Sequence, residues 1–266
     1  MPALARELRS LWSSRRLLWV MARREMAARY AGTAAGMLWA YAQPLLTAAA
    51  YYLVFDIVFA MRLGEHAPTR AVGIYLIAGM LPWMAFCEAL SRGMSSLLDA
   101  GGVLQKNALP PVLFVARSVL ASTVIHAPLL LGLALLYGPQ HHFQPALATL
   151  LPLLALQLAL CLVWGYALAI LAAALRDTVQ LVGFALSVGV FLSPVLFPMA
   201  MFPQDWRWVL WLNPMTPWVA SYQTVLLQGA WPLVQNWAVA LVWIALGAIL
   251  LEVLLRRSRD ELVDWL

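Results

Sequence analysis

Long apolar windows, separated by short charged or proline-rich segments, dominate the pattern along this chain. A helix needs roughly 20 apolar residues to cross the hydrocarbon core of a bilayer. Six windows reach that length and end at charges or turn residues, near 34–60, 71–98, 113–137, 146–174, 178–200 and 233–255. The pattern therefore predicts an all-α polytopic membrane protein with six transmembrane helices within residues 31–266.

Residues 1–30 follow a different pattern, in which arginines flank an apolar stripe. The stripe consists of Leu4, Leu8, Leu11, Leu18, Ala22 and Met26. A basic helix with one apolar face typically lies in a membrane interface, so we expect a cytoplasmic amphipathic interfacial helix here. Because Ser13, Ser14 and Arg15 interrupt the stripe, a disordered basic tail is the alternative.

The first window opens with small residues at helical spacing. Gly32 and Gly36 form a G-x-x-x-G pattern, and Ala40, Gln43 and Thr47 continue along the same helical face. Small residues let helix backbones approach closely in lipid. We expect this face to pack within the protein, with a dimer seam or a pore wall as the alternative.

The segment 194–218 is rich in proline and tryptophan. Its five prolines forbid one continuous helix, and its four tryptophans suit a membrane interface. We expect short, broken re-entrant helices on the outer side of the membrane. Such backbone is tolerated at membrane depth only where protein or water surrounds it.

Composition and charge support the membrane class and orient the chain. Hydrophobic residues make up 64% of the chain and charged residues only 11%, which excludes an ordinary soluble domain. Placing the N-terminus in the cytoplasm puts 14 basic residues inside and three outside, so both termini, including the tail 256–266, are predicted to be cytoplasmic. The net charge of +5 then favours anionic lipid over nucleic acid as a partner.

Nucleotide and metal chemistry find no support in the sequence. The chain has one lysine, Lys106, and it does not follow the glycines of a phosphate-binding loop. His141 and His142 lie in a predicted turn without a nearby carboxylate, and Cys87 and Cys161 lie in apolar runs. We therefore expect no metal site and no catalytic residue.

Two alternatives of a different class remain. Ser95 and His126 would have to meet in an intramembrane serine protease, but their predicted depths differ. An ion-coupled carrier would want more acids near the midplane than Glu88 and Asp56. We expect Glu88 to pair with Arg92 at i,i+4, and Asp56 to reach water at the outer end of its span.

Four motifs, in this order, resemble one known family: "RYAGTAAGMLWAYAQPLL" at 29–46, "YLIAGMLPW" at 75–83, "LQKNALPPVLF" at 104–114 and "WLNPMTPWVASYQTVLLQG" at 211–229. Together they resemble the membrane permease subunit of type-2 ABC transporters (the ABC-2 family), in the class that exports bacterial O-antigen, capsule and teichoic acid. The third motif departs from the family, whose members often carry a more basic loop with a Phe-Pro pair.

The resemblance implies a multi-pass subunit of the bacterial inner membrane that moves lipid-linked polysaccharide outward. The implied partners are a second copy of the chain, two copies of a separate ABC ATPase, and a periplasmic or outer-membrane export protein. This chain would hold no cofactor, because the ATPase would bind ATP and magnesium. An exporter of a drug or a small lipid is the nearest alternative.

The resemblance also implies roles for individual residues, with the first and fifth spans lining the path. The substrate path and its cytoplasmic mouth would include Arg29, Tyr30, Trp39, Gln43, Tyr51 and Trp83. Contacts with the ATPase would involve Gln105, Lys106, Asn107, Arg176 and Asp177. The outer gate would include Pro194, Phe197 and Pro198. Arg29 would meet a lipid phosphate or simply anchor the helix at the headgroups.

Overall fold

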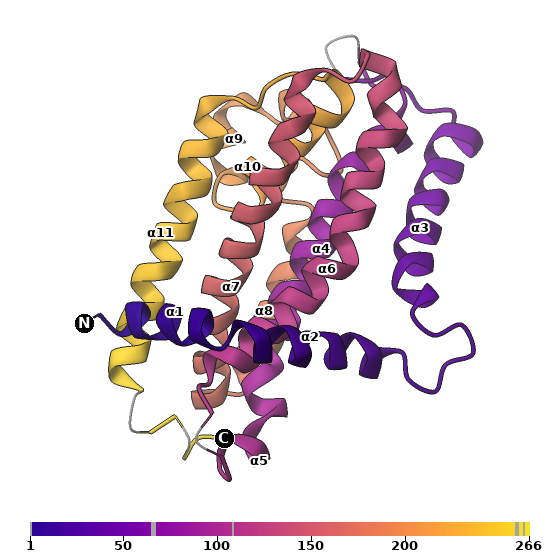
Figure 1. The fold of residues 1–266 in the computed structure, drawn as a ribbon. Helices are drawn as coiled ribbons and strands as arrows, with labels where there is room; N and C mark the ends of the chain where they lie inside the picture. The colour runs from indigo at the N-terminus through magenta and orange to yellow at the C-terminus, as the bar shows by residue number, and fades with distance from the viewer. Residues whose placement is uncertain (1, 65–67, 108, 259–260, 263) are drawn as a thin grey trace.

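The computed structural model describes residues 2–64, 68–107, 109–258, 261–262 and 264–266. Within them the chain is helical, and the one extended pairing is a single antiparallel bridge between Arg62 and Ala71. Four helices in this part of the chain are long and apolar enough to cross a membrane: Val72–Asp99, Val112–His141, Pro145–Ala174 and Val234–Arg257. They stand side by side as the body of the molecule (Figure 1). The all-helical membrane class is thus confirmed.

These four helices end close to their predicted limits. They comprise α4 (Val72–Asp99), α6 (Val112–Tyr137) with the 3-10 turn η2 (Gly138–His141), α7 (Leu150–Ala174) preceded by η3 (Pro145–Thr149), and α11 (Val234–Arg257). The hairpin between α6 and α7 turns at residues 142–144, where His142 and Phe143 adopt positive φ. Charges and turn residues at the ends of the apolar windows set these limits.

The core is centred on α4, which is covered by α6 and α7. Gly93 of α4 lies against Gly165 of α7, and a Cβ at Gly93 would lie 2.9 Å from Cγ2 of Val119 on α6. The absence of side chains at the two glycines therefore lets three helices approach closely. Gln157 of α7 adds a buried polar link, since its amide donates to the Pro82 carbonyl at 3.1 Å and its oxygen accepts from the Tyr222 hydroxyl at 3.0 Å.

The predicted span 34–60 begins later than expected. Helix α3 covers Leu38–Tyr52 and continues as a π-helix, η1 (Leu53–Val58), while residues 30–37 form turns. Gly32 and Gly36 have positive φ (78° and 52°) in these turns, and a Cβ on either would meet no other atom within 4 Å. The expectation that they begin a helix-packing face was therefore wrong, because both glycines serve the backbone of a turn.

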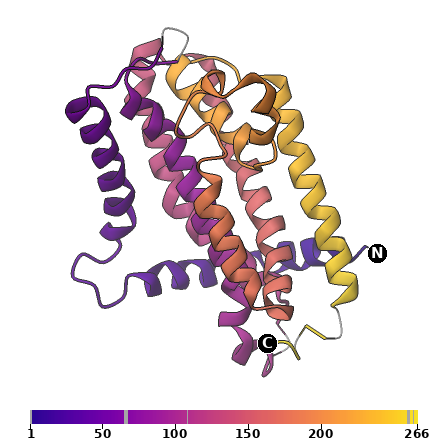
Figure 2. The same ribbon diagram turned by 180° about the vertical axis from the view of Figure 1, so that it is seen from behind.

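The predicted span 178–200 is a shorter helix. Helix α8 covers Asp177–Gly189, and residues 190–198 continue in turns. Beyond them the chain forms the expected short helices: η4 (Met199–Met201), η5 (Gln204–Trp206), α9 (Arg207–Leu210), α10 (Thr216–Gln223) and η6 (Thr224–Gln228). Seen from behind, α8 lies on the face opposite α6 (Figure 2).

The N-terminal segment is helical, as predicted, but broken at Ser14 into α1 (Ala3–Ser13) and α2 (Arg15–Arg29). Both helices lie across the long helices near one end of the molecule (Figure 1). At the same end a short helix, α5 (Gly101–Leu104), follows α4. A Cβ at Gly101 would lie 2.8 Å from the Leu266 carbonyl oxygen, so the C-terminal residue packs against α5.

Candidate functional site

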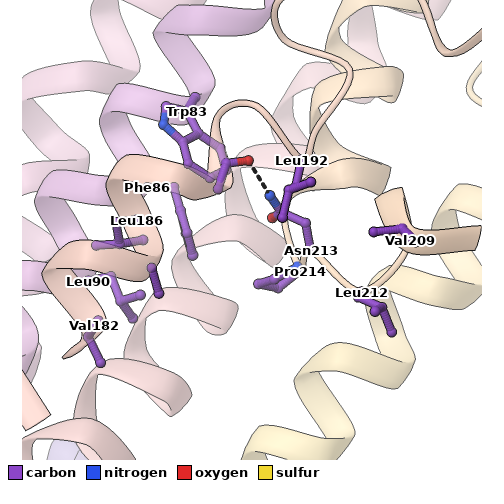
Figure 3. A pocket seen from close by; sticks show the side chains of 12 residues that line it. Trp83, Phe86, Leu90, Val182, Leu186, Leu192, Val209, Leu212, Asn213 and Pro214 are labelled. Carbon is purple, nitrogen blue, oxygen red and sulfur yellow. Dashed lines mark hydrogen bonds between the residues drawn. The ribbon is translucent and has the colours of Figure 1, made fainter. Parts of the chain in front are cut away.

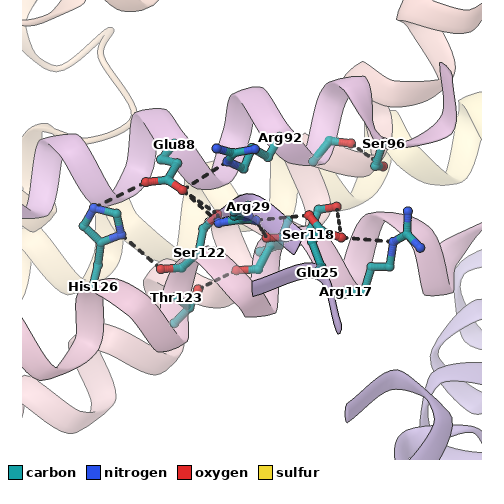
Figure 4. Close-up of polar contacts among 12 residues, drawn as sticks. Glu25, Arg29, Glu88, Arg92, Ser96, Arg117, Ser118, Ser122, Thr123 and His126 are labelled. Carbon is teal, nitrogen blue, oxygen red and sulfur yellow. Dashed lines mark hydrogen bonds and ion pairs between the residues drawn. The ribbon is translucent and has the colours of Figure 1, made fainter. Parts of the chain in front are cut away.

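Arg29, predicted at the cytoplasmic mouth, is buried in a network of ion pairs (Figure 4). Its side chain is 5% exposed; one terminal nitrogen lies 3.1 Å from Glu25 and the other 2.8 Å from Glu88. The same two nitrogens also donate to the Ser122 hydroxyl at 3.1 Å and the Ser118 carbonyl at 3.2 Å. Both terminal nitrogens therefore bind within the protein, and a contact with a substrate phosphate stays a prediction.

Glu88 is the acidic centre of this network. It accepts from Arg92 at 3.1 Å, which confirms the predicted i,i+4 pair, and lies 3.6 Å from Nε2 of His126. The other ring nitrogen of His126 lies 3.0 Å from the Ser122 carbonyl oxygen. Among the described residues neither nitrogen contacts Ser95, so the geometry that a serine protease requires is not found.

Tyr30 joins the network to a small apolar cluster. It packs with Met26 of α2, Ala40 of α3, and Ala121 and Ile125 of α6. Partial burial raises the pKa of the Tyr30 hydroxyl, and the neighbouring Glu88 carboxylate raises it further. The cluster holds the α2–α3 corner against α6.

The other predicted path residues lie in two different surroundings. Trp39 and Gln43 are exposed on α3, and Tyr51 on the same helix is half-buried. Trp83 is instead buried in α4, with 5% of its surface exposed. The structure therefore does not bring Trp83 together with the α3 residues on one continuous exposed face.

Trp83 lines an apolar cavity of about 300 Å³ between α4, α8 and the segment that follows α9 (Figure 3). The Asn213 amide lies at its edge, but it donates to the Gly189 carbonyl at 2.8 Å and its oxygen accepts from the Met215 N–H at 2.9 Å. Because its polar groups are already bonded, the cavity suits an apolar occupant better than water.

The predicted coupling residues lie on two turns at the end of the molecule where α1 and α2 lie (Figure 1). Gln105, Lys106 and Asn107 follow α5, and all three are exposed. Arg176, between α7 and α8, and Asp177, the first residue of α8, are exposed as well. Both turns are accessible to another protein, and their role in coupling stays a prediction.

The predicted outer-gate residues are held by buried donors that the sequence reasoning missed. The Pro194 carbonyl accepts from the Tyr75 hydroxyl at 2.8 Å and from the Gln223 amide at 2.9 Å. The same hydroxyl donates to Phe197 at 3.1 Å. A Cβ at Gly79 would lie 2.7 Å from the Gln223 amide nitrogen, so the glycine makes room for this contact. The sequence signal that could have identified these donors is the presence of polar side chains within apolar windows.

Two carboxylates accept backbone N–H groups at the start of another helix. Asp56 does not reach water as expected: its side chain is 6% exposed and it pairs with Arg62 at 3.3 Å. It also accepts the Gly73 N–H at 2.7 Å, at the start of α4. Glu252 of α11 accepts the N–H groups of Ala3 and Leu4 at 2.9 and 2.6 Å, and so caps α1.

Comparisons with known proteins agree with this architecture. Residues 16–227 match the ABC-2 type transporter family. The O-antigen export system permease protein RfbA of Myxococcus xanthus is 30% identical over 235 residues, which cover 85% of this chain and 86% of that protein. Two proteins of the same name from Klebsiella pneumoniae are each 22% identical over 222 residues, covering 80% of this chain and 81% of theirs. This chain is therefore a multi-pass membrane permease that belongs to the ABC-2 type transporter family.

Proposed function

We propose that this chain is the transmembrane subunit of an ATP-driven exporter that moves lipid-linked cell-surface polysaccharide of the O-antigen class across the bacterial inner membrane. The observation that supports this most is the family match, together with three relatives named O-antigen export permeases that align over at least 80% of the chain. The chain would act without a nucleotide site of its own, as a transport subunit rather than an enzyme.

The proposed topology has six crossings with both termini in the cytoplasm. Helix α3 and η1 contribute 15 and 6 residues, which at about 1.5 Å per residue reach across the hydrocarbon. Helix α8 has only 13 residues, so the turns at 190–198 would complete its crossing. The bonds from Tyr75, Gln223 and Asn213 to carbonyls around these turns support such a crossing, since unbonded backbone is not tolerated in lipid.

A separate ABC ATPase, in two copies, would bind ATP with magnesium and drive transport. The exposed residues 105–107 and 176–177 support this, because together with α5 they form an accessible surface at one end of the molecule to which another protein could bind. The path would run along α3 and α8, and Trp39, Gln43 and Tyr51 on α3 would offer aromatic and amide groups to sugar rings. A periplasmic or outer-membrane protein would then receive the polymer.

A homodimer would cover apolar surface that the single chain leaves exposed. On α3, Leu38, Leu45 and Leu46 are 70%, 52% and 63% exposed, and on α8, Leu181 and Phe184 are 65% and 69% exposed. Because α3 and α8 are also the two helices expected to line the path, the second copy of the chain would lie against them.

Deletion of the gene in the native host tests the proposed substrate. Sugar analysis of fractionated cells should show that polysaccharide disappears from the cell surface and accumulates inside on a lipid carrier. Restoring the gene on a plasmid controls for effects on neighbouring genes. If surface and internal polysaccharide are both unchanged in a strain without a redundant exporter, the substrate class is wrong, and a drug or small lipid becomes the better candidate.

A further inference from the structure

Charged side chains cross the contact between α2 and the long helices at two places (Figure 4). Arg29 of α2 lies 2.8 Å from Glu88 of α4, and Glu25 of α2 lies 3.0 Å from Arg117 of α6. The Ser118 hydroxyl adds a bond to Glu25 at 3.0 Å. These bonds break if α2 moves away from the long helices.

The central charges, Glu25, Arg29 and Glu88, each have a further partner on their own helix. Glu25 and Arg29 form an i,i+4 pair at 3.1 Å within α2, and Glu88 and Arg92 form one at 3.1 Å within α4. A buried charge that loses its only partner is strongly destabilising. Here separation leaves both carboxylates and Arg29 paired, so the arrangement allows α2 to leave without stranding a central charge.

Arg117 also keeps favourable surroundings when α2 leaves. Arg117 would lose Glu25 when α2 leaves, but its side chain is 27% exposed and therefore reaches water. Its guanidinium also lies 4.9 Å from the centre of the Phe114 ring, a cation–π contact within α6 that does not depend on α2.

Helix α2 is attached separately from α1. In α2 only Ala22 and Met26 are buried, and Met21 is partly buried against the core, so few apolar side chains hold it in place. Helix α1 has its own attachments, the Glu252 cap on α11 and a bond from the Tyr166 hydroxyl to Glu7 at 3.4 Å. Ser14, with φ of −100° and ψ of 16°, is the one residue between the two helices, so it is the point at which α2 would pivot while α1 stays bound.

We propose that α2 is a releasable latch on the inner ends of α4 and α6, and that Glu88 is the positioning residue that keeps it closed through Arg29. Opening the latch separates Met26 from Ala121 and Ile125 on α6. The inference goes beyond the proposed function, because it concerns the motion of a helix and holds for any transported molecule.

The test measures how fast a cysteine at position 26 reacts with a water-soluble maleimide in membranes of the native host. Met26 is 8% exposed in the closed latch, so the parent variant Met26→Cys, with Cys87 and Cys161 replaced by alanine, should react slowly. Reaction in native membranes keeps every natural partner in place. The measurement does not involve transport, so its result does not depend on the proposed substrate.

Two charge-removing substitutions should act in opposite directions. Glu88→Gln removes the negative charge that faces Arg29 and leaves only a neutral amide oxygen, and we expect the labelling rate to rise about tenfold because the hydrogen bond loses its charge assistance. Arg92→Gln removes one competing partner of Glu88 and leaves the carboxylate to Arg29 and His126, so labelling should slow about twofold to threefold. A purely structural ion network would loosen in both variants.

Asp205→Asn is the control, because it removes an exposed acid of η5 that lies outside the α2 contact and forms no ion pair among the described residues, and it should leave the rate unchanged. The latch is overturned if Glu88→Gln reacts at the parent rate, or if Arg92→Gln reacts faster than the parent. If Glu88→Gln does not accumulate in the membrane, Arg92→Gln decides alone: slower labelling supports the latch, and an unchanged or faster rate overturns it.

Discussion

Helices α4 and α3 are both apolar, yet they have opposite surroundings. In α4, 17 of 28 residues are buried, whereas in α3 only Ala40 and Pro44 of 15 residues are buried. Helix α8 resembles α3, with no buried residue in its 13 positions. Hydrophobicity alone therefore does not distinguish a helix that packs inside this chain from one whose surface is free to contact lipid or another protein.

The difference lies in small and polar residues rather than in total hydrophobicity. Helix α4 has Gly79 and Gly93 where neighbouring helices approach, and Tyr75 where carbonyls need a donor. Helix α3 is attached mainly at its two ends, through Tyr41 and its neighbours near α6 and through Asp56 near Gly73. Each attachment can be broken separately, which makes the comparison testable.

The largest effect is expected at Gly93, where α4, α6 and α7 meet. Gly93→Leu would place a side chain against Val119 and Gly165, and we expect a loss of about 3 kcal/mol in the free energy of unfolding. Gly183→Leu on α8 is the matched substitution, since nothing lies within 4 Å of a Cβ there. Unfolding temperatures of both variants in detergent test the contrast. Equal destabilisation would show that α8 is packed as tightly as α4.

A smaller effect is expected at Gly73, which holds the C-terminal end of α3. A Cβ there would lie 2.7 Å from the Tyr52 Cα, so Gly73→Ala should displace α3 at a cost of about 2 kcal/mol. The loss should remain local to α3, and hydrogen exchange of α3 amides should rise while the amides of α7 stay protected. Gly102→Ala, in open space, is the control. A uniform rise over all helices would contradict a separate attachment of α3.

The Tyr75 hydroxyl should contribute less, because its loss removes donors without changing the packing. Tyr75→Phe removes the hydroxyl donor of the Phe197 carbonyl and leaves the Pro194 carbonyl with the Gln223 amide alone, and we expect a loss of about 1 kcal/mol. Tyr52→Phe, on a side chain of α3 that is 43% exposed, should change stability by less than half as much. Chemical unfolding in mixed detergent micelles compares the two, and a larger loss from Tyr52→Phe would reverse the comparison.

The smallest effect concerns Glu7, which attaches α1 to α7 through the Tyr166 hydroxyl. Burial raises the pKa of the Glu7 carboxyl above its usual 4.5, against the weaker opposing effects of the Tyr166 hydroxyl and Arg6. The folded chain therefore holds this proton more tightly than the unfolded chain, and stability falls as the pH rises from about 4.5 through the raised pKa.

Glu7→Gln should remove this pH dependence and exceed the parent in stability at neutral pH. The difference in unfolding temperature between the two proteins, measured at about pH 5 and about pH 8, should grow with pH. A difference that shrinks toward the higher pH would show that Glu7 is stabilised in its ionised form.

The sequence predicted the long helices well because their limits depend on local signals. Helix α4 begins and ends within one residue of its expected window, since charges and turn residues stop it at both ends. The failures involve long-range contacts. Residues 190–198 turn where a longer helix was expected, and they are held by Tyr75 and Gln223, which lie 119 and 29 residues away from Pro194.

The candidate site shows the same division. The pair of Glu88 with Arg92 was predictable, because both residues lie on one helix face. The contact of Arg29 with Glu88 joins residues 59 apart, and it changes the expected surroundings of Arg29 from open headgroups to a buried network. Roles that depend on a second chain or a substrate lie beyond what one folded chain displays.

The connection between α3 and α4 has a practical consequence for where this chain can vary in length. Asp56 fixes the end of η1 to α4, and the Leu63 N–H donates to the Arg70 carbonyl at 2.9 Å beside the bridge of Arg62 with Ala71. These contacts hold the two sides of the connection together, so lengthening the loop beyond them costs little free energy. An epitope inserted after the exposed Gly64 should leave both helices in place and report which side of the membrane this end of the molecule faces.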